Sequence, residues 1–248
     1  MKIGIIGTGQ IGKTLVRTLS SAGHDVKVAN SRGPETIEAE ILTSGARATT
    51  ARDAMADVEA IILSIPLNSL GDIALLLADV PEEVVVIDTS NYYPFRDGPI
   101  AAIDAGQVES LWVVEQLGRP IAKAWNAIGS GSLATKRQPA GSQGRVAIPV
   151  AADRPRDREV AMALVDDSGL DPFDAGSLAD SWRQQPGAPC YGSDLTREEM
   201  GDALKAAEKA RLPKRRDLAV AVMQERLGDG TTNPDAEFGV RLSRAIFR

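Results

Sequence analysis

The chain has 248 residues, of which 43% are hydrophobic and 25% charged, and its 28 basic and 34 acidic side chains give a formal net charge of −6. A chain of this length and composition buries a sizeable core in one large domain, with room for a small second part. The acidic balance argues against a nucleic-acid binder or a basic membrane-surface protein. No apolar run reaches the roughly 20 residues of a spanning helix, and no small-residue cleavage site follows the first apolar stretch, so we expect a cytoplasmic protein without a membrane partner.

Cysteine and histidine are each present once, as Cys190 and His24. An internal disulfide and a zinc site of several Cys and His ligands are therefore excluded, and we expect no metal site. A Ser-His-Asp hydrolase would have to use His24, which lies in a predicted turn. Aromatic residues make up only 4% of the chain, so surfaces that stack nucleic-acid bases are not expected.

The first 90 residues alternate short apolar runs with segments of helical period. The apolar runs predict strands at residues 3–6, 26–29, 60–65 and 84–87. Between the first two, Ile11, Leu15 and Leu19 recur on one face of a helix, and a second helical segment follows Pro66. The runs are almost continuously apolar, which is typical of strands buried on both faces of a parallel sheet.

The middle of the chain continues this pattern with weaker signals. Strands are predicted at residues 122–125 and 146–150, a loop at 138–144, and a helix at 158–167 that is followed by an apolar segment at 170–173. The alternation of strands and helices predicts an α/β fold with a doubly wound parallel sheet.

After about residue 195 the composition changes. Residues 195–248 carry 11 basic and 9 acidic side chains, against 17 and 25 in the rest of the chain. Thr196 and Glu199 have the spacing of a capping box, and two or three helices are predicted. One face of the last is predicted to carry Phe238, Leu242, Ala245 and Ile246. We interpret Lys214-Arg215-Arg216 as a solvated helix start, and a phosphate or an acidic partner is the alternative.

The segment Gly7-Thr8-Gly9-Gln10-Ile11-Gly12 matches the dinucleotide-binding pattern G-x-G-x-x-G. It directly follows a predicted strand and opens a predicted helix, which is the context the pattern requires. Gly7 permits the tight turn, Gly9 lets the backbone approach a pyrophosphate, and Gly12 lets helix and strand pack closely. The helix N-terminus adds unpaired N–H groups and a partial positive charge. A turn that merely needs glycines is the alternative.

The second predicted strand ends in Asn30-Ser31-Arg32, where an NAD site usually has a carboxylate for the ribose 2′-hydroxyl. No carboxylate repels a 2′-phosphate here, Ser31 can donate to it, and the guanidinium of Arg32 can bind it. A charge-assisted hydrogen bond is worth roughly 1.5 to 3 kcal/mol, so we predict about a ten- to hundredfold preference for NADP(H). An exposed arginine in a surface turn is the alternative.

Two further loops follow the strands predicted at residues 60–65 and 84–87. In open α/β sheets ligands lie at the carboxyl ends of the strands, so we expect these loops to flank the nicotinamide ribose and ring. The candidate contacts in them are Ser64, Ile65, Pro66, Asn68, Thr89 and Asn91. Asp88 can instead cap the turn that follows its strand.

Together these segments resemble the deazaflavin-dependent NADP oxidoreductase family. The resemblance is carried by the glycine-rich opening through Asn30-Ser31-Arg32, by the loops LSIPLNSL and VIDTSNYY, by Lys123-Ala124-Trp125-Asn126 and by the segment DAGSLA that starts at Asp174. It spans about residues 1–182 and implies hydride transfer between NADP(H) and coenzyme F420. It also implies NADP contacts from Thr8, Gly9, Gln10, Ile11, Ser31 and Arg32, and a second cofactor stacked near Asn126.

The family resemblance implies a Rossmann domain with a small carboxyl-terminal part, often assembled as a homodimer. We therefore expect an NADP-binding Rossmann domain with a small substrate part over residues 1–182, and a helical extension over residues 183–248. Because the apolar faces of this extension must be buried, we expect it to act as a dimer arm. A tail folded over the acceptor pocket of a monomer is the alternative.

Hydride transfer between two stacked rings needs positioning and exclusion of water rather than a side-chain base, so we expect no catalytic acid or base. Reduction of a small carbonyl or imine would need a proton donor, for which Lys123, Lys205 and Lys209 are candidates. A ferric acceptor and a non-catalytic NADPH-binding redox sensor are further alternatives. Cys190 is expected to be a half-buried, inert thiol, although it could line the acceptor pocket.

Overall fold

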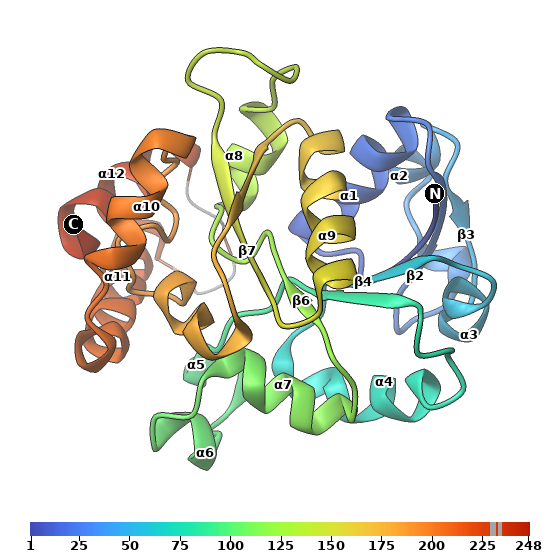
Figure 1. Cartoon of the computed structure of the whole chain (residues 1–248), viewed down its shortest axis with the longest axis horizontal. Helices are drawn as coiled ribbons and strands as arrows, with labels where there is room; N and C mark the ends of the chain where they lie inside the picture. The colour runs from blue at the N-terminus through green and yellow to red at the C-terminus, as the bar shows by residue number, and fades with distance from the viewer. Residues whose placement is uncertain (229–231, 233–234) are drawn as a thin grey trace.

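Eight strands form one sheet in the order β3-β2-β1-β4-β5-β6-β7-β8 in a computed structural model that describes residues 1–228, 232 and 235–248 (Figure 1). The strands are β1 Lys2–Ile6, β2 Asp25–Ala29, β3 Arg47–Ala48, β4 Ala60–Leu63, β5 Val85–Asp88, β6 Ala122–Lys123, β7 Ala147–Ala152 and β8 Asp171–Asp174. The helices are α1 Gln10–Ser21, α2 Ala39–Leu42, α3 Ala51–Met55, α4 Leu70–Leu77, α5 Pro94–Asp97, α6 Ala101–Asp104, α7 Glu109–Leu117, α8 Ser130–Thr135, α9 Pro155–Asp167, α10 Arg197–Lys205, α11 Leu212–Leu227 and α12 Ala236–Phe247. This arrangement confirms the predicted Rossmann-type α/β fold with carboxyl-terminal helices.

One pair of neighbouring strands departs from the predicted parallel sheet. β6 and β7 run antiparallel, while all other paired strands are parallel. The connection between two antiparallel neighbours starts and ends at the same edge of a sheet, so residues 124–146 leave and return at the carboxyl end of β6. Trp125, Asn126 and α8 therefore lie at the edge at which the parallel strands end.

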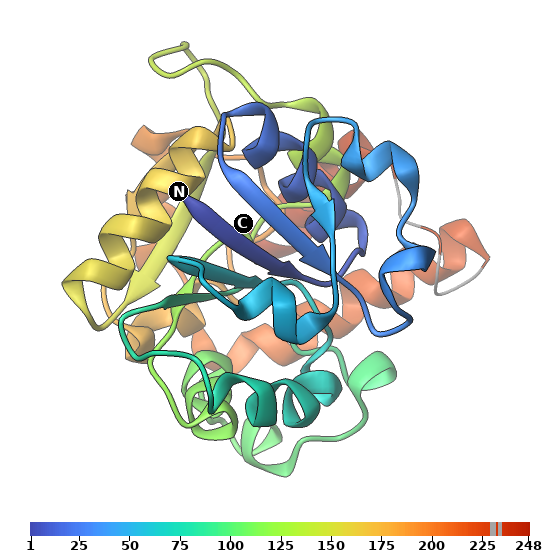
Figure 2. The same cartoon turned by 90° about the vertical axis from the view of Figure 1, so that its right-hand side faces the viewer.

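The apolar strands bury both of their faces, as predicted. Ile3, Ile5, Ile62 and Val85 belong to a core cluster with residues of α1 and α9, whereas Ile6, Ile61 and Val86 belong to a second cluster with residues of α3, α4 and α7. Successive strand residues point to opposite faces, so a run without polar residues serves two helix layers at once. Figures 1 and 2 show α9 on one side of the sheet and α4 and α7 on the other.

Several element boundaries differ from the predictions. The strand predicted at 60–65 ends at Leu63, the one predicted at 122–125 is only Ala122–Lys123, and the one predicted at 146–150 extends to Ala152. The predicted loop at 138–144 is present, and the helix predicted at 158–167 begins earlier, at Pro155. The four-residue helices α2, α5 and α6 were not predicted, because four residues are too few to show a helical period.

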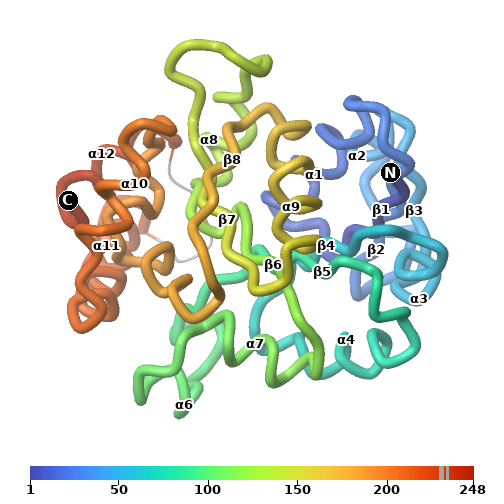
Figure 3. The backbone as a smooth tube through the Cα atoms, viewed as in Figure 1, coloured from blue at the N-terminus to red at the C-terminus, as the bar shows by residue number. Residues whose placement is uncertain are grey.

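The carboxyl-terminal helices pack at the end of the molecule that is far from β1 to β3 (Figure 3). A third core cluster joins Cys190, Leu195, Met200 and Leu212 to Ala147 of β7, with Phe173 of β8 packed against it. The predicted capping box at Thr196 and Glu199 is present at the start of α10. In α12 the buried residues are Ser243 and Phe247, so the face predicted from Phe238 and Leu242 is wrong by about one position. A division into two domains at residue 182 stays a prediction.

Gly12 provides a test of the packing between α1 and β1. A Cβ atom at Gly12 would lie 2.1 Å from the carbonyl oxygen of Gly7, which is backbone and cannot rotate away. We expect Gly12→Ala to lower the free energy of unfolding by at least about 2 kcal/mol, measured by urea denaturation. Gly71→Ala is the matched control, since a Cβ there meets nothing within 4 Å and alanine favours α4 by up to about 1 kcal/mol. Equal stability of the two variants would contradict this packing.

Candidate functional site

The turn between β1 and α1 carries the glycine pattern. Gly7 has a φ of 110°, a conformation that L side chains rarely adopt, and its N–H donates to the carbonyl oxygen of Ala29 over 2.8 Å. Gly9 is the N-cap residue of α1, where no side chain caps the helix and no acidic residue lies in the first turn. A Cβ at Gly9 would meet nothing within 4 Å. The amides at this end of α1 are therefore open to an anion.

A cleft of about 660 Å³ opens at the carboxyl edge of the sheet. It is lined by the turn after β1, the loops after β4 and β5, the segment after β6, and the helices α11 and α12. The residues predicted from the sequence that line it are Gly9, Gln10, Ile11, Ser64, Ile65, Pro66, Thr89, Asn91 and Asn126. Loops from four strands thus meet where open α/β sheets bind their ligands.

The remaining predicted residues do not line the cleft; they are Gly7, Thr8, Gly12, Asn30, Ser31, Arg32 and Asn68. Gly7 and Gly12 shape the turn, as their close backbone approaches show. The side chain of Asn30 closes the loop after β2, since its Oδ1 accepts from the N–H of Arg32 over 2.9 Å. Ser31 and Arg32 are exposed on this loop, beside the strand that leads into the glycine turn.

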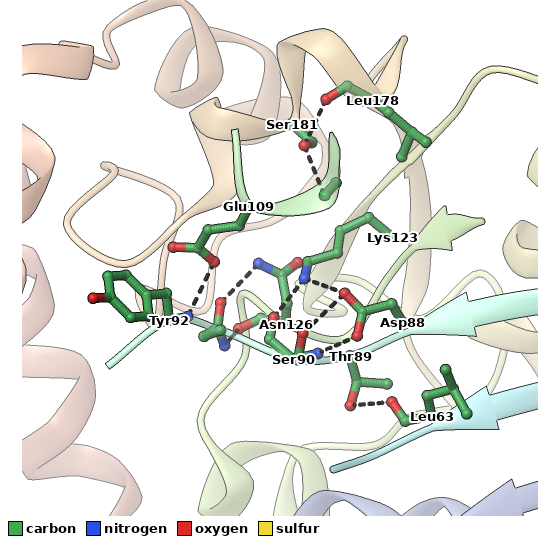
Figure 4. A network of polar contacts seen from close by, with 12 residues as sticks. Leu63, Asp88, Thr89, Ser90, Tyr92, Glu109, Lys123, Asn126, Leu178 and Ser181 are labelled. Atoms are coloured by element: carbon green, nitrogen blue, oxygen red, sulfur yellow. Dashed lines mark hydrogen bonds and ion pairs between the residues drawn. The ribbon is translucent and has the colours of Figure 1, made fainter. Parts of the chain in front are cut away.

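A buried ion pair lies behind the loop that follows β5 (Figure 4). Lys123 and Asp88 are 1% and 0% exposed, and Nζ lies 2.6 Å from Oδ2. Nζ also donates to the carbonyl oxygen of Ser90, and the two oxygens of Asp88 accept from the N–H and the hydroxyl of Ser90, each over 3.0 Å. Lys123 is therefore not a proton donor at the cleft but an ion-paired lysine that holds the loop, and Asp88 caps the turn as the alternative interpretation had it.

Asn91 and Asn126 face one another across the cleft floor through paired amides. Nδ2 of Asn126 donates to Oδ1 of Asn91 over 3.1 Å and to the carbonyl oxygen of Gln184 over 2.9 Å, while Nδ2 of Asn91 donates to the carbonyl oxygen of Asn126 over 2.8 Å. Gln184 completes the set by donating from Nε2 to Oδ1 of Asn126 over 2.8 Å. Trp125 precedes this set with a φ of 56°, a strained value for a buried aromatic residue. The orientation of both asparagines is thus fixed by their neighbours.

Two tyrosines that the sequence reading did not single out meet in the cleft. The hydroxyls of Tyr93 and Tyr191 lie 2.8 Å apart, and Nδ2 of Asn91 donates to the hydroxyl of Tyr191 over 3.2 Å. Burial raises the pKa of Tyr93, and burial together with the neighbouring Tyr93 raises the pKa of Tyr191 well above its ordinary value. Both hydroxyls therefore stay protonated at neutral pH, and because one donates to the other, the pair has one hydroxyl proton left for a ligand. They are 98 positions apart in the chain, so no local pattern signals the pair.

The other reactive side chains lie elsewhere. Cys190 is fully buried rather than half-buried, and burial raises the pKa of its thiol to about 12, so the thiolate does not form at neutral pH. It does not line the cleft, nor do Lys205 and Lys209, which are exposed. His24 also lies outside the cleft, and its Nε2 lies 3.0 Å from Oδ2 of Asp167.

The helices α11 and α12 form one wall of the cleft. Ala219, Val220 and Met223 of α11 face it, as do Gly239 and Val240 of α12. The tail therefore covers the cleft within a single chain, in the arrangement that the sequence offered as the alternative to a dimer arm. A homodimer stays a prediction.

Arg216 corrects the interpretation of Lys214-Arg215-Arg216 as a solvated helix start. Lys214 is exposed, but Arg216 is only 8% exposed and lines the cleft, and the side chain of Arg215 is 11% exposed. The helix α11 lies across the cleft, so its fifth residue points inward while its third points to solvent. The spacing of three consecutive charges could not reveal which of them faces the protein.

Glu109 is a buried carboxyl beneath the same region, at the start of α7. Its Oε2 accepts from the N–H of Tyr92 over 3.1 Å. Burial raises its pKa to about 7, although the positive charge of Lys123 and the bond from Tyr92 act in the opposite direction. The folded protein therefore holds a proton on Glu109 over a pH range in which the unfolded chain releases it.

The stability of the protein should consequently depend on pH through Glu109. Because the folded-state pKa is raised from 4.5 to about 7, the contribution of Glu109 falls as pH rises through this window, by roughly 3 kcal/mol in all. We expect Glu109→Gln, whose amide oxygen can still accept from Tyr92, to lose this fall in the free energy of unfolding with pH. Urea unfolding followed from about pH 4 to about pH 8 measures it. Glu115→Gln, on the exposed face of the same helix, should run parallel to the wild type. Parallel curves for wild type and Glu109→Gln would refute the raised pKa.

Comparison with known proteins agrees with the predicted resemblance. Residues 2–92 match the family model described as "NADP oxidoreductase coenzyme F420-dependent", which confirms the resemblance for this part of the chain. The Escherichia coli (strain K12) protein YjhV is 48% identical over 81 residues, which are 31% of this chain and 59% of YjhV. The match thus spans a little over half the length of that relative.

Solved structures extend the likeness to the fold. A hypothetical protein, SMa0349, from Sinorhizobium meliloti is 25% identical with a TM-score of 0.66, over 79% of this chain and 93% of that one. A protein from Arthrobacter sp. FB24, provisionally named an F420-dependent NADP reductase, is 18% identical with a TM-score of 0.59, over 94% of this chain and 97% of that one. The second likeness concerns the fold alone.

Two features are absent from the part of the chain that the structure describes. None of the helices there is both long and apolar enough to cross a membrane. Within the same residues, no three His, Cys, Asp or Glu side chains gather in a way that could hold a metal ion.

Proposed function

We propose that this chain, whose residues 2–92 match the coenzyme F420-dependent NADP oxidoreductase family, transfers a hydride between NADP(H) and a flat redox ring. Coenzyme F420 is the first candidate acceptor and an ordinary flavin the second. The observation that carries the proposal is the uncapped amino terminus of α1, which opens into a cleft of about 660 Å³. A helix end of this kind binds phosphate, and a cleft of this volume accommodates a cofactor-sized ligand.

The residues at the glycine turn fit a dinucleotide. The amides of Gly9, Gln10 and Ile11 would bind the pyrophosphate, because no side chain competes for them. Ser31 and Arg32 would bind the 2′-phosphate on the exposed loop after β2, where no acidic side chain is present at positions 30–32. NADPH supplies the hydride once it is bound.

The opposite half of the cleft fits a second ring. Ile65 and Pro66 of the loop after β4 line it together with Val220 and Met223 of α11, and these four side chains give the cleft apolar walls. Apolar walls exclude water and hold two rings close, which is what direct hydride transfer requires. The NH2 groups of Asn91 and Asn126 are already engaged, so these amides can contact a ring edge only by accepting a hydrogen bond at Oδ1.

The test is anaerobic oxidation of NADPH by the purified protein, with F420, FMN, FAD, a ferric chelate or no acceptor. Rapid reduction of F420 or of a flavin is the expected result. Activity with the ferric chelate alone would identify ferric iron as the acceptor in place of a flat ring. The proposed NADP(H) site would be unaffected by that result. Binding of NADPH without turnover on any acceptor would contradict the proposal and favour a redox sensor.

Arg32 should set the preference for NADPH over NADH. We expect Arg32→Gln to reduce that preference in kcat/KM by about ten- to hundredfold, since it removes a charge-assisted contact with the 2′-phosphate. Arg52→Gln is the matched control, because Arg52 is an exposed arginine that pairs with Asp79 away from the cleft. An unchanged preference in Arg32→Gln would show that the loop after β2 does not bind the 2′-phosphate.

The tyrosine pair favours a second candidate function, the reduction of a small carbonyl or imine. Such a reaction needs a proton donor beside the acceptor, and Tyr93 and Tyr191 place two protonated hydroxyls in the cleft.

Tyr191→Phe separates the two functions. If the acceptor is a carbonyl or imine, we expect kcat to fall by about a hundredfold or more, because the proton donor is lost. If the acceptor is a flat ring, the rate should change by much less. Tyr92→Phe, whose hydroxyl bonds Asp104 outside the cleft, controls for loss of a buried hydroxyl.

A further inference from the structure

We propose that Arg216 forms a subsite for an anionic group, a carboxylate or a phosphate, on the molecule that accepts the hydride. The inference rests on the proposed function, because it takes the cleft to hold an acceptor beside NADP(H). It assigns a role to a residue of α11, which lies outside residues 2–92 that match the family model.

Arg216 is a mostly buried arginine with one hydrogen-bond partner among the described residues. Its Nε donates to Oδ1 of Asp217 over 2.8 Å, and Asp217 is 62% exposed on the solvent side. The structure gives no hydrogen bond from either Nη atom to any described residue, although the residue is only 8% exposed and lines the cleft. Both Nη groups are therefore open to a ligand that enters the cleft. Its planar fork matches the two oxygens of a carboxylate or phosphate.

The other charged groups of the cleft are already engaged. Among the described residues that line it, the charged ones are Arg96, Arg216 and Asp235. Arg96 makes two bonds to the carboxylate of Asp97, at 2.9 and 2.8 Å, and Asp235 caps α12 by accepting from the N–H of Phe238. Arg96 thus has only Nη1 left for a ligand, whereas both Nη groups of Arg216 are open.

The position of Arg216 separates it from the phosphates of the dinucleotide. Its guanidinium carbon lies 5.3 Å from the centre of the Tyr92 ring, and Tyr92 follows β5. The glycine turn follows β1, two strands away in the order β1-β4-β5, or about 10 Å at the usual strand spacing. The loop with Ser31 and Arg32 follows β2, on the far side of β1. An anion at Arg216 thus belongs to the second molecule in the cleft.

The surroundings of Arg216 also suit an anion on an acceptor. The hydroxyls of Tyr93 and Tyr191 line the same cleft and can donate to an oxyanion. Glu109 is the buried carboxyl near Arg216, and the positive charge of Arg216 is among the influences that lower its pKa. Glu109 makes no ion pair with Arg216 in the structure, so its carboxyl does not occupy the two Nη groups.

Matched probes test the subsite by calorimetric binding, with and without NADPH. FMN and riboflavin share a ring and differ by a phosphate, while pyruvate and methyl pyruvate differ by a free carboxylate. The wild type should bind FMN over riboflavin, or pyruvate over its ester, by about tenfold or more. The pair that shows discrimination identifies the anion.

Arg216→Gln should abolish that discrimination and leave NADPH affinity unchanged. Arg216→Lys keeps the charge without the fork, so it should retain part of the discrimination, and it serves if the Gln variant is unstable. Arg211→Gln, an exposed arginine paired with Glu208, is the matched control. Discrimination that survives in Arg216→Gln overturns the subsite, as does a wild type that discriminates in neither pair.

The two proposals fail in different ways. If Arg216→Gln weakens NADPH binding as much as it weakens FMN or pyruvate binding, Arg216 belongs to the cofactor and the acceptor subsite is refuted. If the wild type discriminates between the probes but never oxidises NADPH, the subsite stands and the hydride transfer is refuted.

Discussion

The ion pair between Asp88 and Lys123 connects the two halves of the structure. The two residues are register partners, each the last residue of its strand, and β6 has only two residues to join β5 on one side and β7 on the other. With so few backbone hydrogen bonds, this junction depends on its side chains. Both partners are buried, so removing either one would leave an uncompensated charge, which costs about 3 to 5 kcal/mol. The pair therefore fixes where β7, β8 and the helices beyond them lie.

The same ion pair positions the floor of the cleft. Lys123 and Asp88 use their remaining hydrogen-bonding capacity on the backbone and hydroxyl of Ser90, which lies between Thr89 and Asn91. The residues directly after Lys123 include Trp125 and Asn126, so the two loops that face each other share one anchor. Asn91 and Asn126 can pair as amides because their backbones are held at this distance. The buried ion pair of Lys123 and Asp88 thus connects the strands of the sheet to the loops that line the cleft.

The amino acid sequence predicts the first half of this arrangement well. Apolar runs mark β1, β2, β4 and β5 because both of their faces are buried, and the glycines around residue 9 mark the turn because their geometry is local. Polar residues after β4 and β5 lie in the cleft, as expected from strand ends in a parallel sheet. These features depend on residues that are close together in the chain, so one amino acid sequence is enough to predict them.

Contacts between distant residues could not be predicted in this way. Lys123 pairs with a residue 35 positions away, and Tyr93 meets Tyr191 at a separation of 98. The antiparallel β7 was missed because an apolar run does not reveal the direction of its strand. Arg216 was placed in solvent because α11 has both buried and exposed basic residues in a row, and only the packing of the helix decides between them.

The cleft that results has positive character at two separated points. The amino terminus of α1 offers a partial positive charge at the end of β1, and Arg216 offers a full charge beyond β5. The apolar side chains of Ile65, Pro66 and Val220 line the same cleft. A molecule with an anion at each end and a flat, weakly polar middle would fit this order, as would two molecules placed ring to ring with their anions apart. The second arrangement is the one that direct hydride transfer needs, because it lets phosphate contacts far from the reacting atoms hold the rings together.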